Sequence, residues 1–275
     1  MPPRTAKVKP PEVRKPDALP KASGIIKRGS KQNPPNHREI PPDDIIRPNK
    51  VTTLDADGSR LLYLPNVFSE ADPTTTENKD HLQSKALFRE LQNGGYWQQG
   101  FVKLFGKEIA EPRLTCYFGD HGYKYSGRQL SKAEYPAAVR KIKDAVEARL
   151  KAWFEEHQEG NSDLPLPLSR LEFNSVLLNR YRGGEDSQGW HSDNEAVYGR
   201  DPVIASVSFG CEREFCFRHC KDHKRKRSLV LEHGSLLLMF GPIQHHWQHC
   251  LPKRKKVQGE RINLTFRQVV VGVGS

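Results

Sequence analysis

The sequence has few cysteines and no long hydrophobic run. Its five cysteines are scattered over 275 residues, and none forms a Cys-x-x-Cys pair. An odd, scattered set argues against a disulfide framework and is typical of a reducing compartment. No segment approaches the roughly 18 apolar residues of a membrane-spanning helix, and the first residues lack the apolar core of a signal peptide. These absences predict an intracellular protein with no membrane partner.

Hydrophobic residues are scarce as well, at 36% of the chain, and residues 1–50 are especially poor in aliphatic clusters. This segment holds 11 of the 20 prolines, and its 12 Lys+Arg against five Asp+Glu give it +7 of the net charge of +11. Such a composition cannot bury enough apolar surface to offset the entropy of ordering. We therefore predict that residues 1–50 form a disordered, basic, proline-rich arm and that residues 51–275 form the folded domain. The pI near 9.4 favours an anionic partner, nucleic acid first.

Hydrophobic spacing after the arm predicts two helices followed by many strands. Residues 60–68 favour a strand, and apolar residues then recur at helical spacing within 77–95 and, more regularly, within 139–154. From Leu171 the pattern changes to short runs with period two, at 171–182, 203–219, 228–232, 235–241 and 261–271. We therefore predict an α+β fold, in which two helices support a double-sheet core of the jelly-roll (double-stranded β-helix) kind over about 171–271.

The stretch "RINLTFR" places its polar side chains on one face of a strand. That face carries Arg261, Asn263, Thr265 and Arg267. By the same count Asn179 and Tyr181 share a face of the earlier strand "FNSVLLNRY". Arginines inside a small barrel are costly unless an anion pairs with them, and a carboxylate is the natural bidentate partner of a fixed guanidinium. The pattern predicts a pocket for a small acidic ligand inside the sheet.

The stretch "GWHSDNEAV" offers two metal ligands. In an extended segment His191 and Asp193 project to the same side, so both can reach one ion. A third ligand could come from one of four later histidines, between which spacing alone does not choose: His233, His245, His246 or His249. Two histidines and one carboxylate on one face of an ion form the facial triad of non-haem Fe(II) oxygenases, which leaves positions open for a bidentate cosubstrate and O₂.

Together, "WHSDNE", "HHWQHCLPKRKK", "RINLTFR" and the upstream "NRY" resemble the AlkB-type Fe(II)/2-oxoglutarate dioxygenases, which oxidatively dealkylate nucleic acids. The resemblance covers roughly residues 95–271. It implies that His191, Asp193 and His249 bind Fe(II), and that residues 51–275 are a dioxygenase domain with a nucleotide-recognition region at about 95–130. It further implies that the cosubstrate 2-oxoglutarate is held by Asn179, Tyr181, Arg261, Thr265 and Arg267, with Asn263 on the same face.

Further motifs, among them "LFGKEIAEPR", "GYKYSG", "FRH" and "PKRKK", are similar to AlkB homologue 2, the type that acts on double-stranded DNA. The similarity implies an aromatic wedge that fills the gap left by a flipped base; its residues would be Leu104, Phe105 and Gly106. The pocket for the flipped base would involve Tyr123, Tyr125, Ser126, Asn194 and Glu195. Contacts to the DNA backbone would come from Arg113, Lys221, Arg225, Lys226, Arg227, Lys253, Arg254, Lys255 and Lys256.

The sequence also departs from this type. "WHSD" is closer to AlkB homologue 3, which prefers single strands and RNA, Asn194 stands where both types usually carry Asp, and Tyr125 stands where homologue 2 has Phe.

The resemblance implies a nuclear, monomeric enzyme that uses Fe(II), 2-oxoglutarate and O₂ to demethylate 1-methyladenine or 3-methylcytosine in DNA, double-stranded DNA above all. The alternatives are the same reaction on single-stranded DNA or RNA, a peptide-hydroxylating oxygenase, and a non-catalytic nucleic-acid-binding protein with a structural metal.

Overall fold

The computed structural model describes residues 46–68, 84–104, 106–125, 128–158 and 166–270. The predicted arm therefore lies outside the described residues, except for its last five. These five contradict the predicted boundary at residue 50, because Ile46 is buried and Pro48 forms a β-bridge with Tyr63. The described fold thus includes residues 46–50.

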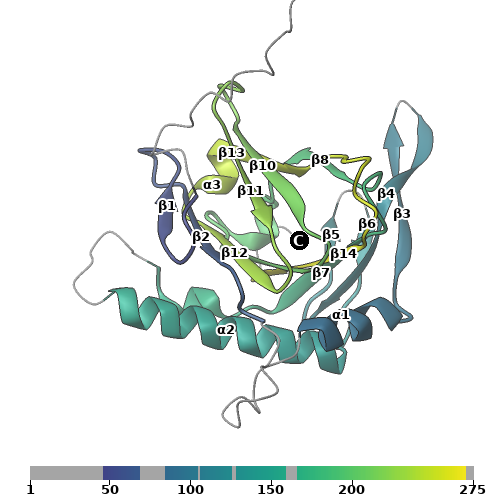
Figure 1. Ribbon diagram of the computed structural model, residues 1–275, viewed down its shortest axis with the longest axis horizontal. Coiled ribbons are helices and arrows are strands. Elements are labelled where there is room, and N and C mark those ends of the chain that lie inside the picture. The colour runs from purple at the N-terminus through teal and green to yellow at the C-terminus, as the bar shows by residue number, and fades with distance from the viewer. Residues whose placement is uncertain (1–45, 69–83, 105, 126–127, 159–165, 271–275) are drawn as a thin grey trace, which may run out of the picture. The chain divides into compact units, whose positions relative to one another are not determined.

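Two antiparallel sheets face each other and form the core, as predicted (Figure 1). The larger sheet has eight strands in the order β1-β2-β12-β9-β14-β7-β4-β3. These strands are β1 (Val51–Thr53), β2 (Arg60–Leu64), β3 (Gln98–Leu104), β4 (Lys107–Gly119), β7 (Ser175–Tyr181), β9 (Ile204–Gly210), β12 (Ser235–Phe240) and β14 (Arg261–Arg267). Strand β14 lies between β7 and β9, so every residue from Arg261 to Arg267 is buried.

The smaller sheet has four strands in the order β11-β10-β13-β8. They are β8 (Gln188–His191), β10 (Arg213–His219), β11 (Lys226–Leu231) and β13 (Trp247–Leu251), and β13 follows the one-turn helix α3 (Ile243–His246). A short hairpin of β5 (Tyr123–Tyr125) and β6 (Arg128–Leu130) stands apart from both sheets. One apolar cluster, which includes Tyr63, Phe217 and Trp247, fills part of the space between the two sheets.

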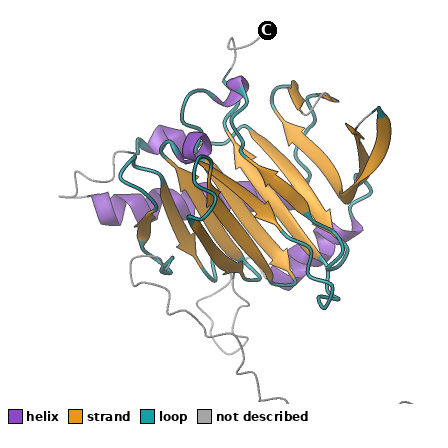
Figure 2. Cartoon of the chain, turned by 90° about the horizontal axis from the view of Figure 1, so that it is seen from above, coloured by secondary structure: helices purple, strands orange, loops and turns teal. Residues whose placement is uncertain are grey.

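Two longer helices, α1 (Ser84–Asn93) and α2 (Ala137–Gln158), cover the face of the large sheet that points away from the small sheet (Figures 1 and 2). In α2 the apolar residues recur every three or four positions, and Val139, Ile142, Val146 and Leu150 are all fully buried. They pack on the outward-facing side chains of the sheet, Leu264 and Phe266 of β14 among them. The two predicted supporting helices are therefore confirmed. Within the described part of the chain, no helix is long and apolar enough to cross a membrane.

The sequence pattern predicted many of the buried strands but missed others, among them the two that carry His191 and His249. Strands β7, β9, β10, β12 and β14 fall within the predicted runs, β2 falls within the predicted strand at 60–68, and β11 overlaps the run 228–232. Strands β8 and β13 were not expected, because each is short and rich in polar residues and so lacks a clear hydrophobic alternation. These two strands pair with each other at one edge of the small sheet.

Candidate active site

The pairing of β8 with β13 places His191 directly opposite His249. The two imidazole rings lie 4.2 Å apart between centroids. Asp193 follows β8 by two residues, and its carboxylate lies 4.0 Å from Nε2 of His191 and 3.9 Å from Nε2 of His249. The three side chains thus converge on one point, with one ligand atom from each.

The charge states of these side chains suit a metal cation. Burial, reinforced by the neighbouring His191, lowers the pKa of His249 to about 3, and burial also lowers the pKa of His191. Both imidazoles are therefore neutral at neutral pH and keep a lone pair for a metal. Burial alone would raise the pKa of Asp193, but the positive charge of Arg267 holds that pKa below its usual range, so the carboxylate stays ionised.

Hydrogen bonds hold the ligand atoms in place. Nδ1 of His191 lies 2.9 Å from the carbonyl of Gly189, which fixes the tautomer with its lone pair on Nε2, the nitrogen that faces Asp193. A guanidinium N–H of Arg267 donates to Oδ2 of Asp193 at 2.7 Å, and the backbone N–H of Asp193 donates to Oε1 of Gln244 at 2.9 Å. Two neutral imidazole nitrogens and one carboxylate, oriented in this way, fit a divalent transition metal such as Fe(II).

The other three candidate histidines lie elsewhere in the described structure. Nδ1 of His233 accepts the backbone N–H of Gly210, and its ring packs beside Phe209. His245 contacts the carbonyl of Arg200, and His246 pairs with Asp57 at 3.7 Å. His249 is therefore the candidate that joins His191 and Asp193.

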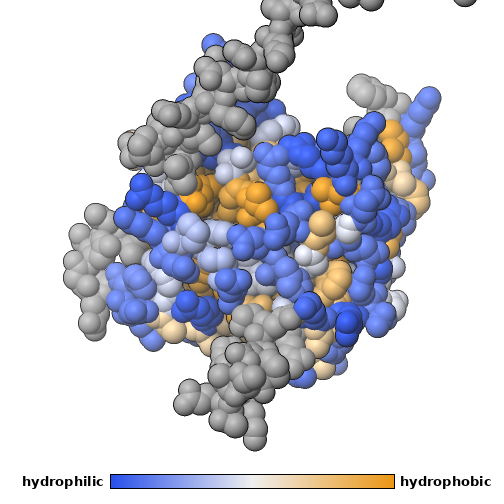
Figure 3. All heavy atoms as spheres, viewed as in Figure 1, coloured by the Kyte–Doolittle hydropathy of each residue, from blue (hydrophilic) through white to orange (hydrophobic). Residues whose placement is uncertain are grey.

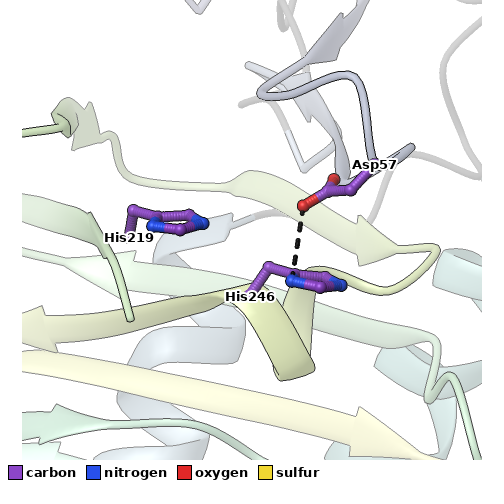
Figure 4. A group of neighbouring side chains, drawn as sticks. All are labelled: Asp57, His219 and His246. Atoms are coloured by element: carbon purple, nitrogen blue, oxygen red, sulfur yellow. Dashed lines mark ion pairs between the residues drawn. The ribbon is translucent and has the colours of Figure 1, made fainter. Parts of the chain in front are cut away.

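A second His/Asp group, Asp57, His219 and His246, lies at the turn between β1 and β2 (Figure 4). Nδ1 of His219 accepts the backbone N–H groups of Lys221 at 3.3 Å and of Asp222 at 3.1 Å. In the neutral ring the proton then sits on Nε2, the nitrogen that lies 3.9 Å from Asp55, so Nε2 has no lone pair for a metal. These contacts suit an ion-pairing cluster that fastens the β1–β2 turn to β10 and α3.

The face predicted on β14 lines the same pocket as the His-Asp-His group. The pocket also receives Asn179 and Tyr181 from β7, so every residue expected to hold the acidic ligand is present there. Arg261 is 2% exposed, and a guanidinium N–H donates to Oγ of Ser208 at 2.9 Å. Its Nε has no hydrogen-bond partner within the described residues, and no carboxylate there pairs with it.

An arginine buried in this way is unusual, because burial penalises its charge. Burial lowers the pKa of Arg261 to about 10, so the guanidinium is still charged at neutral pH. The guanidinium carbon of Arg261 lies over the Tyr181 ring, 5.4 Å from its centroid, and this contact contributes some stabilisation of the charge. The arrangement fits an anion that enters the pocket and pairs with Arg261.

Arg267 contacts the metal group more closely than the sequence suggested. It was expected to hold the cosubstrate, and in the structure its guanidinium is paired with Asp193 within the metal group. Sequence reasoning missed Gln188, whose amide nitrogen lies 3.0 Å from Nε2 of His191 and whose amide oxygen accepts the hydroxyl of Tyr181. It also missed Gln244, since a buried glutamine far along the chain gives no local pattern.

The residues expected around a flipped base are only partly described. Phe105 and Ser126 lie outside the described residues, Leu104 ends β3, and Tyr123 and Tyr125 are the end residues of β5. Gly106 has a φ of 77°, a left-handed conformation that suits glycine in the tight turn between β3 and β4. Asn194 is exposed beside Asp193, and burial raises the pKa of Glu195.

The β3–β4 hairpin exposes hydrophobic side chains. Phe101 is 47% exposed and Ile109 is 44% exposed, which is unusual for large apolar residues. Figure 3 shows hydrophobic colour on this hairpin within a largely hydrophilic face. The hairpin thus presents apolar side chains on either side of the predicted wedge.

Most of the predicted DNA-backbone residues lie in two basic loops at opposite ends of the small sheet. Lys221 belongs to the loop after β10, and Lys255 and Lys256 belong to the loop after β13; all three are exposed. Others already pair with carboxylates: Arg225 with Asp55, Lys253 with Glu185 and Arg254 with Glu214.

The assignment of Arg113 to the DNA backbone was wrong. This side chain is buried, donates to Oε1 of Glu111 at 2.8 Å and donates to Oδ1 of Asn179 at 2.9 Å. It therefore supports the pocket wall instead of facing solvent. The sequence pattern did not predict that Arg113 is buried, because it did not predict the long strand β4, in which Arg113 lies.

A jelly roll with a facial His-Asp-His group beside a buried arginine is the architecture of an Fe(II)-dependent oxygenase that uses a 2-oxo acid. Residues 60–267 match the family described as the 2OG-Fe(II) oxygenase superfamily, and the chain belongs to it. Within the superfamily the similarity is to AlkB homologues. The chain is 38% identical over 216 residues to the DNA oxidative demethylase ALKBH2 of Arabidopsis thaliana, a match that covers 68% of this chain and 63% of the relative.

Two other relatives show the same pattern. The human DNA oxidative demethylase ALKBH2 is 36% identical over 202 residues, covering 69% of this chain and 70% of the relative. The alpha-ketoglutarate-dependent dioxygenase alkB homolog 3 of Bos taurus is 32% identical over 199 residues, a match that covers 69% of this chain and 63% of the relative. The matches to the Arabidopsis protein and the Bos taurus homolog 3 thus span just under two thirds of those relatives.

Proposed function

We propose that this chain is an Fe(II)/2-oxoglutarate-dependent dioxygenase that demethylates bases in DNA, with 1-methyladenine and 3-methylcytosine in double-stranded DNA as substrates. The observation that carries the proposal is the charged, buried Arg261 without a carboxylate partner in the described residues, in the same pocket as the His-Asp-His group. The pocket therefore offers a cation for one carboxylate and a metal group for the other end of a dicarboxylate. Similarity to proteins named DNA oxidative demethylases supports the substrate class.

In this proposal His191, Asp193 and His249 hold the iron, and Arg261 pairs with the distal carboxylate of 2-oxoglutarate, with Asn179 and the other polar residues of the β14 face lining the cosubstrate site. When bound, the iron would supply the oxidising chemistry: one oxygen atom of O₂ goes into succinate as 2-oxoglutarate loses CO₂, and the other hydroxylates the N-methyl group, which is then lost as formaldehyde to restore the unmethylated base.

The chain's own residues position the reactants and exclude water. Phe215, Met239 and Leu177 line the pocket beside the polar groups and reduce the access of water to it. Arg267 keeps Asp193 ionised and holds its pKa below the usual range, so the carboxylate is a poor proton acceptor and acts as a metal ligand. No general base is required for this reaction, and the pocket needs none.

Two features favour double-stranded DNA over a single strand. The basic loops at opposite ends of the small sheet can contact phosphates on both strands of a duplex. The β3–β4 hairpin exposes Phe101 on β3 and Ile109 on β4, the two strands before and after residue 105 in the chain, which suits insertion between stacked bases. Substrate of this kind places the enzyme in the nucleus, and we propose that it acts there as a monomer.

Phe105→Ala tests the preference for duplex DNA. We expect formaldehyde release from duplex 1-methyladenine DNA to fall about 10-fold or more, because an unstacked base pair costs a few kcal/mol that the wedge offsets. Release from the matched single strand should change little. Lys103→Ala on the same hairpin serves as the control for a general loss of DNA contact. Equal losses on duplex and single strand would show that Phe105 is not a wedge.

Single-stranded DNA and RNA are the alternative substrates, which the "WHSD" motif favours. Formaldehyde release should be measured with 1-methyladenine and 3-methylcytosine in matched single- and double-stranded DNA and RNA. The proposal predicts the largest kcat/KM on duplex DNA. A larger kcat/KM on single-stranded DNA or on RNA would show that this alternative, and not duplex DNA, is the substrate.

A further inference from the structure

Gln244 occupies an unusual place beside the metal group. It is 1% exposed and belongs to the one-turn helix α3, which directly precedes the strand of His249. Its amide oxygen accepts the backbone N–H of Asp193 at 2.9 Å. Only the oxygen of an amide can accept an N–H, so this contact fixes which way the side chain is turned.

The segment that carries Asp193 depends on such contacts. Strand β8 ends at His191, so Ser192 and Asp193 lie beyond the paired residues of the ladder. The hydroxyl of Ser192 donates to the carbonyl of Trp247 at 3.0 Å, and the N–H of Asp193 donates to Gln244. These two hydrogen bonds fasten residues 192–193 to residues 244–247, next to the pairing of His191 with His249.

Helix α3 is itself fastened to the rest of the fold. The backbone N–H of Cys220 donates to the carbonyl of His246 at 2.7 Å, and His246 pairs with Asp57, as Figure 4 shows. The amide nitrogen of Gln244 lies 3.7 Å from the sulfur of Met239, a weak contact in comparison. The strong hydrogen bond of Gln244 is thus the one to Asp193.

We propose that Gln244 is a positioning residue for the metal ligand Asp193. Its oxygen holds the backbone N–H of Asp193 in place, so that Oδ1 of the carboxylate lies near His191 and Oδ2, which accepts from Arg267, lies near His249. The inference rests on the metal assignment in the proposed function. Groups that orient metal ligands typically change metal affinity by about 10- to 100-fold when they are removed.

The test measures Mn²⁺ binding to the full chain by electron paramagnetic resonance of the free ion, without DNA or 2-oxoglutarate. Gln244→Leu and Gln244→Met both remove the acceptor oxygen but keep a side chain of similar size, and Gln244→Glu keeps an oxygen at the same place. We expect the Leu and Met variants to weaken Mn²⁺ binding by about 10-fold or more, and the Glu variant to stay within a few fold of the unchanged protein.

Controls separate positioning from packing. His245→Ala changes an exposed neighbour of Gln244 in the same helix, which contacts the carbonyl of Arg200, and should leave the Mn²⁺ dissociation constant unchanged. Thermal melting of each variant monitors the fold, and a variant that fails to fold leaves the comparison to the remaining two substitutions. Unchanged Mn²⁺ binding in the Leu or Met variant, or equal weakening in the Glu, Leu and Met variants, would overturn the inference.

His191→Ala distinguishes this inference from the proposed function. If His191→Ala loses Mn²⁺ binding while the Gln244 variants keep it, only the role of Gln244 is wrong. If His191→Ala binds Mn²⁺ as the unchanged protein does, the metal assignment itself is wrong.

Discussion

Arg261→Met should abolish the response of this protein to 2-oxoglutarate without destabilising the fold. Leaving one partner of a buried ion pair unpaired costs about 3–5 kcal/mol, which corresponds to a loss of affinity of roughly 10²-fold or more. The guanidinium has no carboxylate partner within the described residues, so its removal relieves an unpaired buried charge when the cosubstrate is absent. We therefore expect an unchanged or higher melting temperature without 2-oxoglutarate, and no increase on its addition.

Arg213 is the matched control for this substitution. It is also 2% exposed, but its guanidinium donates to the backbone carbonyls of Gly183, Asp186 and Pro252. Arg213→Met removes a donor from each of these carbonyls, of which that of Gly183 keeps the backbone N–H of Asp186, so it should lower the melting temperature and still allow stabilisation by 2-oxoglutarate. The melting temperatures of both variants, with and without 2-oxoglutarate, decide the matter. If Arg261→Met is still stabilised by 2-oxoglutarate as the unchanged protein is, Arg261 does not bind the distal carboxylate.

Asp193→Ala should remove both metal binding and activity, and it should also destabilise the fold. The substitution deletes one of three metal ligands and removes the buried carboxylate that is ion-paired with Arg267, which costs about 3–5 kcal/mol. We expect formaldehyde release to fall at least about 10³-fold, because the three metal ligands act together and the loss of one disables the site. Differential scanning calorimetry should show a clear drop in melting temperature.

The double variant Asp193→Ala with Arg267→Met separates the two effects. It removes the Arg267 guanidinium together with the Asp193 carboxylate that is ion-paired with it, so we expect most of the lost stability to return while activity stays absent. Recovery of stability without recovery of Mn²⁺ binding would agree with a ligand that is ion-paired to Arg267. If Asp193→Ala retains Mn²⁺ binding or turnover, Asp193 is not a ligand.

Part of this fold and site follows from local patterns in the sequence. Helix α2 was predictable because apolar residues repeat along one face over many turns, and the polar face of β14 was predictable because alternation is strict there. The same alternation brought Arg261 and Asn179 into one pocket. Long regular elements leave a strong pattern, so their faces can be counted along the chain.

Other parts depend on contacts between distant residues. Spacing could not choose His249 over His246, because the choice is made by the pairing of β13 with β8 and by the pairing of His246 with Asp57. Strand β4 was missed, so Arg113 was placed on the surface and is in fact bonded to Asn179. Gln244 and Gln188 are neighbours of the ligands only in three dimensions, and no periodicity reveals them.

The central claim is that one pocket uses 2-oxoglutarate to remove a methyl group from DNA. It is tested most directly by measuring succinate and formaldehyde in the same reaction, with duplex DNA that contains 1-methyladenine, Fe(II) and 2-oxoglutarate. The account predicts that both products appear in equal amounts, that neither appears without 2-oxoglutarate, and that His249→Ala forms neither. Formaldehyde that appears without 2-oxoglutarate, or no formaldehyde from any methylated strand while succinate is formed, would contradict it.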